Sequence, residues 1–510
     1  MGLYNLFLTE MWERFSFYGM RSLLVLYMVN HLFIQPDVGQ RVLGFTALKG
    51  LLESMFGPLA IQPLSSQVYG LYTAFVYLTP LFGGMLADRV IGQRRAVILG
   101  GVLMAIAQFT LMSERLFFPG LMLLILGNGA FKPNISTQVG GLYAEGDPRR
   151  DGAFTIFYMG INLGAFLAPL ICGTLGQTLG WKYGFGAAGV GMLLGLGQYL
   201  WGQRHLAPDW TDTRKATDVL PSLLKIVVLP ALGVAGLVGL LTLPGMLRVV
   251  LLSLAGTVLV AFFIFWFVRL PREERVPVGA LLAVFALNII FWACYEQQGN
   301  TMQLWADRNT DWRLFGFNVP STWFQAFNPF MIFVFAPILS AFWVWQAKRN
   351  REPTSVTKMA AGCFLLGLSY VVMIVGVQGV GPNERRSVMW LFSTTFVLTI
   401  GELYLSPIGL SLVTKAAPQR MVSMMMGAWF LSSFFGNYLS GFLGTFWDRW
   451  NEAQMQILFL EVSGKQIFFT MLTALGLAAG LLMAIINRPL NRVLAHHDRP
   501  ENKQAAETTT

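Results

Sequence analysis

The segment TEMWERFSFYGMR, near the start of the chain, places charged residues in an otherwise apolar stretch. Its ionisable side chains are Glu10, Glu13, Arg14 and Arg21. At 100° per residue of helix, these four residues and Tyr18 lie within an arc of about 140°. They therefore form one polar stripe, which must face other protein or water because a charge that faces lipid is costly. Neighbouring acids and bases of this kind can take up and release protons.

Three more ionisable residues lie in apolar stretches: Lys132 in GNGAFKPNISTQVGG, Glu296 in FWACYEQQGN and Glu402 in TIGELYLSPIGLS. Each charge facing lipid costs about 2.5–3.5 kcal/mol, so all seven groups unpaired would cost on the order of 20 kcal/mol, more than a domain's net stability. We therefore predict that they meet around one hydrated central cavity. Four acids and three bases together can accept a proton at little electrostatic cost, which is what proton coupling requires.

Uncharged polar and aromatic residues in the same stretches have two interpretations. Asn162 in FYMGINLGAFLAP and Asn328 in WFQAFNPF can either line a cavity or join two helices by a hydrogen bond. The aromatic residues with the same ambiguity between lining and packing are Tyr69, Tyr77, Trp292, Tyr295 and Trp429. The cysteines, which show no CxxC spacing and are expected to pack as small hydrophobic residues, are Cys172, Cys294 and Cys363. No metal site is predicted.

The composition is that of a membrane protein. Of 510 residues, 55% are hydrophobic and 12% are charged, against about 25% charged residues in soluble domains. Apolar stretches of nearly twenty residues recur along the chain. The net charge of +10 is spread over short loops without a basic stripe, which argues against nucleic-acid binding. We predict an all-α, polytopic membrane protein.

Fourteen membrane-spanning helices are predicted, at about 2–30, 66–87, 95–113, 117–140, 153–173, 183–202, 221–243, 246–268, 277–298, 323–346, 358–379, 387–412, 420–445 and 466–487. Lys and Arg concentrate in alternate connections and in the C-terminal tail. Because basic loops stay in the cytoplasm, both termini are expected to be cytoplasmic.

The spans fall into two groups of six. We predict an N-terminal six-helix bundle at 1–205, a linker with two additional membrane helices at 206–275, a C-terminal six-helix bundle at 276–490 and a disordered cytoplasmic tail at 491–510. The extra pair is apolar nearly all round, so we interpret it as a lipid-facing brace. Six helices plus six is the arrangement of transporters whose halves move about a site near the membrane midplane.

The long connection at 31–66 contains LGFTALKGLLESMFGPLA, which is largely apolar. It can lie along the outer leaflet as an interfacial helix or pack on the bundle as an ordered loop.

The loop GGMLADRVIGQRR, between the second and third spans, resembles a conserved loop of the major facilitator superfamily. Asp88, at a helix end, can pair with basic groups of a neighbouring helix and hold one conformation. We therefore predict that Asp88 and Arg89 form a conformational latch.

Two further motifs, ExxERFxxYG at 10–19 and FYMGINLGAF at 157–166, resemble those of the proton-coupled oligopeptide transporter family. The resemblance covers essentially all spans and includes the two extra helices of bacterial members. Ala165 departs from it, since many relatives have Ser there. The resemblance implies a major facilitator fold and proton-coupled import of di- and tripeptides across the inner (plasma) membrane by alternating access. It also implies no enzymatic activity, no cofactor besides the coupling proton, and a functional monomer in the lipid bilayer.

The resemblance further implies a role for each matching residue. Proton coupling is expected of Glu10, Glu13, Arg14, Arg21, Lys132 and Glu296, the pair Arg21 and Glu296 bridging the halves. The peptide carboxylate is expected at Arg14, Tyr18 and Lys132, and the peptide amino group at Asn162, Asn328 and Glu402. Pocket-lining roles are expected of Tyr77, Trp292 and Trp429.

Other functions fit the sequence less well. A carrier of the same fold for another small solute, such as nitrate or a drug, is the main alternative, although Glu402 and the acid-rich second half disfavour a lone anion. A membrane acyl- or glycosyltransferase needs catalytic groups converging near an interface, and the only histidines, all in loops or the tail, are His31, His205, His496 and His497. A non-transporting receptor or scaffold does not need titratable groups in both halves.

Overall fold

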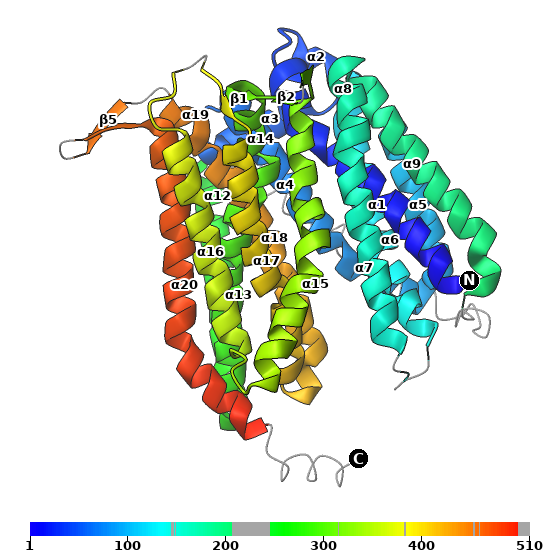
Figure 1. The fold of residues 1–510 in the computed structure, drawn as a ribbon, viewed down its shortest axis with the longest axis vertical. Coiled ribbons are helices and arrows are strands. Elements are labelled where there is room, and N and C mark those ends of the chain that lie inside the picture. Colours follow the sequence, from blue (N-terminus) through cyan, green and yellow to red (C-terminus); the bar gives the residue numbers. More distant parts are fainter. Residues whose placement is uncertain are drawn as a thin grey trace.

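The computed structural model of the protein describes residues 1–143, 147, 149–206, 245–314, 316–381, 384–451, 454–457 and 460–497. Long helices stand side by side, and their ends gather at two opposite faces of the molecule (Figure 1). Helices form their backbone hydrogen bonds within one segment, as a chain surrounded by hydrocarbon requires.

A first group of helices comes from residues 1–206. Its long members are α1 (Gly2–Tyr27), α4 (Ile61–Leu86), α5 (Gln93–Thr110), α6 (Phe117–Gly141), α7 (Arg149–Ala168) and α9 (Trp181–Gly202). Helix α1 packs on α7 and α9, while α6 packs on α4 and α5. The stripe-bearing helix α1 is therefore enclosed by neighbours.

A second group follows residue 271. Its long members are α13 (Arg272–Tyr295), α15 (Phe327–Lys348), α16 (Ser355–Gly376), α17 (Met389–Ala416), α18 (Val422–Gly444) and α20 (Gly464–His497). Helix α16 packs on α17 and α20, and α13 packs on α18 and α20. The two groups meet where α4 packs on α18 and α7 packs on α15.

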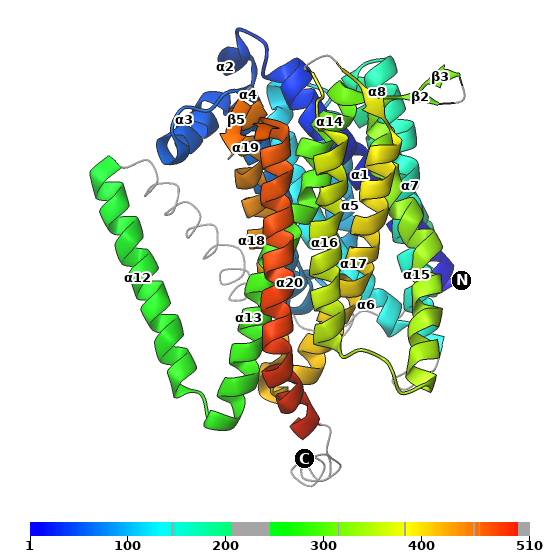
Figure 2. The same cartoon turned by 60° about the vertical axis from the view of Figure 1, so that its left-hand side comes forward.

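Helix α12 (Gly245–Arg269) stands apart from both groups (Figure 2). Its exposed apolar residues include Val258, Phe262 and Phe265. This exposure fits the lipid-facing position predicted for the extra pair. The other predicted member of that pair, at 221–243, lies outside the described residues.

Each predicted span that falls on described residues has a long helix within a few residues of it. Eight of the described helical segments are long and apolar enough to cross a membrane by composition alone. Helix α1, which carries the four charged residues of the stripe, is not among them. Helix α20 runs to His497, through the first residues of the predicted tail. The boundaries of the predicted domains remain predictions.

Shorter elements connect the long helices. The short α-helices are α2 (Val38–Arg41), α3 (Phe45–Phe56), α8 (Thr174–Thr178), α14 (Thr301–Asn309) and α19 (Phe446–Asn451). The π-helical segments are η1 (Met28–Leu32), η2 (Ala87–Ile91) and η4 (Pro169–Gly173). The 3₁₀ segments are η3 (Glu114–Leu116), η5 (Gln203–His205), η9 (Glu296–Gly299), η10 (Ser321–Ala326) and η11 (Gln419–Met421).

Three small two-stranded sheets lie at the same end of the bundle as α3 and α8 (Figures 1 and 2). Strand β1 (Thr310–Asp311) pairs in parallel with β4 (Arg386–Ser387). The antiparallel pairs are β2 (Arg313–Leu314) with β3 (Phe317–Asn318), and β5 (Gln454–Ile457) with β6 (Leu460–Ser463). We call this end the outer end, because the charge distribution predicts that it is extracellular.

The connection at 31–66 folds onto the bundle. Helix α3 buries Phe45 and Leu52, and the Phe45 ring meets Phe33 edge-on with centroids 5.1 Å apart. The structure therefore supports the packing interpretation of this segment, although Met55 on the same helix is exposed.

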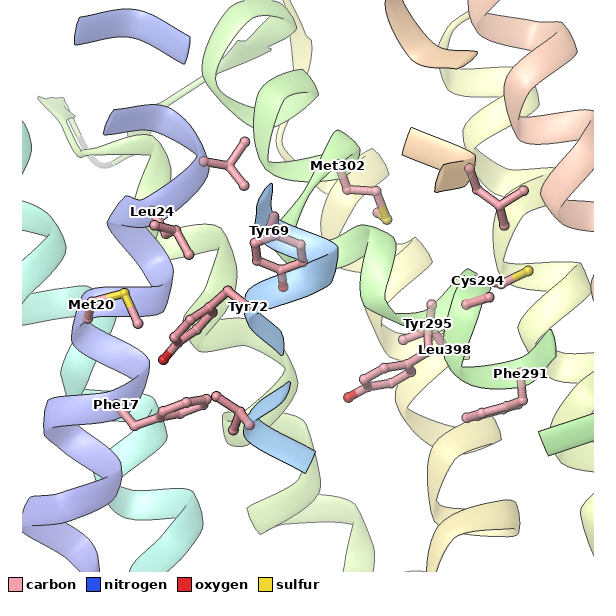
Figure 3. Packing of buried hydrophobic residues seen from close by; sticks show 14 of the residues in the cluster. Phe17, Met20, Leu24, Tyr69, Tyr72, Phe291, Cys294, Tyr295, Met302 and Leu398 are labelled. Carbon is pink, nitrogen blue, oxygen red and sulfur yellow. The ribbon is translucent and has the colours of Figure 1, made fainter. Parts of the chain in front are cut away.

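The core next to α1 is aromatic. Figure 3 shows Tyr69 and Tyr72 of α4 between side chains of α1 and side chains of α13. Phe17 stacks on Tyr72 with ring centroids 6.5 Å apart. The three cysteines are buried and form no disulfide bond with one another, as predicted for packed hydrophobic residues.

Glycines allow α4 and α6 to approach closely. A Cβ atom added to Gly83 would lie 1.9 Å from the carbonyl oxygen of Gly129, which is far inside van der Waals contact. The obstacle is backbone, so it cannot turn aside as a flexible side chain can. Only glycine fits at this crossing.

We expect Gly83→Ala to destabilise the protein by about 1–3 kcal/mol or more, since it forces two backbones apart. Thermal unfolding in detergent measures the change. The matched control is Gly197→Ala on α9, where an added Cβ meets nothing within 4 Å; it should be neutral or slightly stabilising, because alanine favours helix over glycine. Equal unfolding midpoints for the two variants would contradict the close approach of the α4 and α6 backbones at Gly83.

Candidate functional site

The inner part of the α1 stripe forms a compact ion cluster. Glu10, Glu13 and Arg14 are all at least 97% buried. The Arg14 guanidinium donates two hydrogen bonds to the Glu13 carboxylate, one from Nε and one from Nη2. The Nη2 atom lies 2.7 Å from Glu13 Oε1. The Nε atom also lies 3.3 Å from Glu10 Oε1. Lys132 of α6 is close enough to interact electrostatically with this cluster. Its Nζ lies 5.1 Å from the Tyr77 ring centroid, and it makes no ion pair among the described residues.

Arg21, at the outer part of the stripe, reaches the second helix group. Its Nη2 pairs with Oε2 of Glu296 in η9, which is 1% exposed. Tyr69 of α4 completes a triad, accepting a hydrogen bond from Arg21 Nε at 3.0 Å and donating one to Glu296 at 3.3 Å. A charge from each group of helices is thereby neutralised at their junction.

Glu402 of α17 is held differently. Its Oε2 accepts hydrogen bonds from the Tyr295 hydroxyl at 2.7 Å and from Asn328 Nδ2 at 2.9 Å. Both donors are neutral and belong to the second helix group, and the described residues provide no cation that pairs with this carboxylate. Glu402 can therefore still accept a positively charged ligand.

A cavity of about 150 Å³ lies between the two helix groups. The predicted site residues that line it are Tyr18, Arg21, Tyr77, Asn162, Trp292, Glu296, Asn328 and Glu402. They come from α1, α4 and α7 on one side, and from α13, η9, α15 and α17 on the other. Residues as far apart in the sequence as Tyr18 and Glu402 thus share one polar chamber.

Several predicted residues do not line this cavity. The single chamber expected for all seven ionisable groups is divided, because Glu10, Glu13 and Arg14 form the separate cluster described above and Lys132 lies behind Tyr77. Trp429 is 4% exposed and packs edge-on against Phe285 with ring centroids 5.9 Å apart. Trp429 was expected from the resemblance to line the cavity, and in this conformation it does not.

The predicted latch residues lie at the other end of α4. Asp88 and Arg89 are exposed in the π-helical turn η2. No ion pair of Asp88 is found within the described part of the chain. The latch role therefore remains a prediction.

Other lining residues were not singled out from the sequence. The cavity is also lined by Tyr158, Gln298 and Gln325. Tyr295 lines it too, which decides between the packing and lining interpretations of that residue. Tyr158 lies four residues before Asn162 on the same face of α7, and Asn162 Nδ2 donates to its carbonyl oxygen at 3.0 Å. A residue four positions before an intramembrane Asn lies on the same helix face, so this spacing could have indicated from the sequence that Tyr158 lines the cavity.

The two helix groups are joined above the cavity by polar contacts. Asp307 of α14 accepts hydrogen bonds from Asn30 at 2.9 Å and from Gln177 at 3.3 Å, both in the first group, and from Ser321 at 2.6 Å in its own group. Among the described residues, all side-chain hydrogen bonds between the groups lie between the cavity and the outer end. These contacts hold the two groups together on the outer side of the cavity.

Two groups of membrane-spanning helices around a polar chamber define a membrane transporter of the major facilitator type. The model of the POT family matches residues 94–459. The chain is 36% identical over 464 residues to the peptide transporter YePEPT of Yersinia enterocolitica subsp. palearctica serotype O:3, with 87% of each chain covered. It is 32% identical over 511 residues to a di-/tripeptide transporter of Lactococcus lactis subsp. cremoris, covering 97% of this chain and 96% of the relative.

The fold agrees. A crystal structure of peptide transporter POT in complex with sulfate matches with a TM-score of 0.79 at 32% identity, over 96% of this chain and 95% of the other. The chain belongs to the POT family, as its two sequence motifs indicated.

We expect Arg21→Met to destabilise the protein by about 3–5 kcal/mol, because it leaves the buried Glu296 carboxylate without its cation. The double variant Arg21→Met/Glu296→Gln removes both charges and should recover most of the loss. Thermal unfolding of Arg21→Met, Glu296→Gln and the double variant gives the coupling free energy between the two side chains. If the effects of the single variants simply add, the pair is not energetically linked.

Proposed function

We propose that this protein is a proton-coupled symporter that imports di- and tripeptides across the inner membrane by alternating access. The observation that carries the proposal is the polarity of the cavity: an uncompensated carboxylate, Glu402, faces it from one helix group, and the cations belong to the other. Relatives named as peptide and di-/tripeptide transporters support the same substrate class.

A peptide's amino group suits the Glu402 side of the cavity. Two neutral donors already orient this carboxylate, so an ammonium group can bind it without displacing an existing cation. Asn328 and Asn162 lie beside it and supply further polar contacts. Every di- or tripeptide carries the same terminal charges, so this recognition does not depend on side chains.

The peptide's carboxylate suits the opposite side, where Tyr18 lines the cavity. Lys132 is the cation without an ion pair, and it lies directly behind Tyr77. Arg14 is fully engaged by Glu13 and Glu10 in this conformation. It becomes available to a peptide when a proton neutralises one of those carboxylates, which connects proton uptake at the ion cluster to substrate binding.

Glu296 connects protonation to the movement of the halves. A proton entering from outside neutralises Glu296 and weakens its pairing with Arg21, the charged contact between the two helix groups. The hydrogen bonds around Asp307 then break as the outer end opens, and they form again once the substrate has bound. Asp88 and Arg89 act as a latch at the opposite end in the alternative conformation. Trp429, buried here, lines the pocket when α18 moves.

The remaining assignments follow the sequence. The protein functions as a monomer with both termini in the cytoplasm, and it transports its solute without chemical change. Its bundles are 1–205 and 276–490, joined by the linker at 206–275. Only protons, peptides and lipid are needed as partners.

We expect uptake of a labelled dipeptide into proteoliposomes to depend on an acidic exterior. One proton moving down about 100 mV delivers about 2.3 kcal/mol, which supports roughly 50-fold accumulation. Lys132→Ala should lose this accumulation, because its charge belongs to the coupling cluster, and should keep exchange of internal for external dipeptide only with lower affinity, because the same charge attracts the peptide carboxylate. The control Lys182→Ala, exposed at the outer end, should behave like the unchanged protein. Uptake indifferent to the gradient would disprove symport, and no uptake would disprove peptide transport.

We expect Glu402→Gln to lower dipeptide affinity roughly 10- to 100-fold, the value of a lost charge-assisted hydrogen bond. Competition between a labelled dipeptide and unlabelled competitors measures it. N-acetylated dipeptide, which lacks the ammonium group, should bind the variant and the unchanged protein equally. The control Glu53→Gln on α3 lies far from the cavity. An equal loss of affinity for both competitors would show that Glu402 does not bind the amino group.

A further inference from the structure

A second hollow lies beside the cavity, on the outside of the bundle between α7 and α15. Its volume is about 220 Å³. Its walls are Asn162, Leu163 and Phe166 of α7 and Pro329, Phe330 and Phe333 of α15. We call it the lateral cleft.

The lateral cleft opens away from the protein core. Leu163 is 37% exposed, Phe330 46% and Phe333 52%. The rings of Phe166 and Phe330, which bridge the two helices, have centroids 5.9 Å apart. The cleft is therefore accessible from the surroundings of the bundle.

The depth of the cleft determines which part of the bilayer reaches it. The helical segments that form it, Gly152–Thr178 and Ser321–Lys348, are both membrane spans by length and composition. The lining residues lie near the middle of each, about 15 Å from the lipid head groups in a typical bilayer. Head groups cannot reach this depth, whereas acyl chains end there.

The chemistry of the lining excludes water as a stable occupant. A buried water needs two to four polar partners, and an apolar cavity of about 150 Å³ stays dry and accepts benzene. The amide nitrogen of Asn162 is already bonded to Tyr158 of its own helix. The space therefore suits a hydrocarbon.

We propose that the terminal part of a lipid acyl chain occupies the lateral cleft and seals the seam between the two helix groups. Asn162 and Pro329 form a wall shared by the cleft and the polar cavity. An acyl chain on the far side of this wall keeps water and protons from passing sideways between α7 and α15. The proposal does not depend on which solute the cavity binds.

The test uses the full chain in vesicles of phosphatidylcholine that carries a photoreactive diazirine at the end of one acyl chain. After irradiation, mass spectrometry locates the labelled residues. We expect several-fold more label on the lining residues Phe330 and Phe333 than on Leu368 and Val375 of α16, which are similarly exposed on a helix outside the cleft. Lipid with the diazirine next to the head group should not label the cleft.

Variants of the lining give the matched comparison. Leu163→Trp fills the cleft and should remove most label from Phe330 and Phe333, while Leu368→Trp should leave it unchanged. Phe333→Ala enlarges the cleft and should increase label on Phe330, so the proposal stays testable if the filled variant folds poorly.

Two outcomes overturn the proposal. Equal labelling of the cleft and of α16 shows ordinary surrounding lipid without a site. Loss of cleft labelling on adding phenylalanyl-phenylalanine shows that the cleft receives substrate side chains instead of an acyl chain. Persistence of the excess label with saturating dipeptide supports the lipid assignment.

Discussion

The cost of a charge in hydrocarbon fixes the interior of this protein. Arg21 and Glu296 are 275 residues apart, yet each needs the other because neither can face lipid. Tyr69 bonds to both and brings α4 to the same point. One buried interaction thereby sets the positions of three helices from two different groups, and the cavity forms beside it. Phe17 of α1 stacks on Tyr72 of α4 and adds apolar packing between two of these helices.

The ionisable groups differ in how far they are compensated. Arg14 pairs with two carboxylates and Arg21 with one, whereas Glu402 is held by neutral donors and Lys132 has no ion pair among the described residues. Compensated pairs stabilise a fixed arrangement. Groups that lack a counter-ion within the protein are the ones for which an external charge is favourable, so Glu402, which lines the cavity, favours a positively charged group of a ligand.

The sequence predicted more of the fold than of the site. Apolar stretches located the helices well, since each span must bury its own backbone polar groups, and the arc of charges on α1 correctly identified the face that meets protein. Helical periodicity gives the face of a residue but not its distance from another helix. For that reason neither the separation of Glu13 from the cavity nor the packed position of Trp429 could be predicted. Tyr158 was missed because aromatic residues are too common here to stand out.

The contacts between the helix groups differ in what it costs to break them. Asp307 is held by neutral donors, among them Asn30, near the exposed outer end, where water can replace each bond as it opens. The pair of Arg21 and Glu296 has no such replacement, since removing one partner leaves a buried charge. Any opening of the two groups therefore needs a compensating charge at this pair at the same moment. In the proposed mechanism a proton on Glu296 compensates the carboxylate, while Arg21 keeps its charge against the polar cavity that it lines. This buried ion pair would then make movement of the halves depend on protonation.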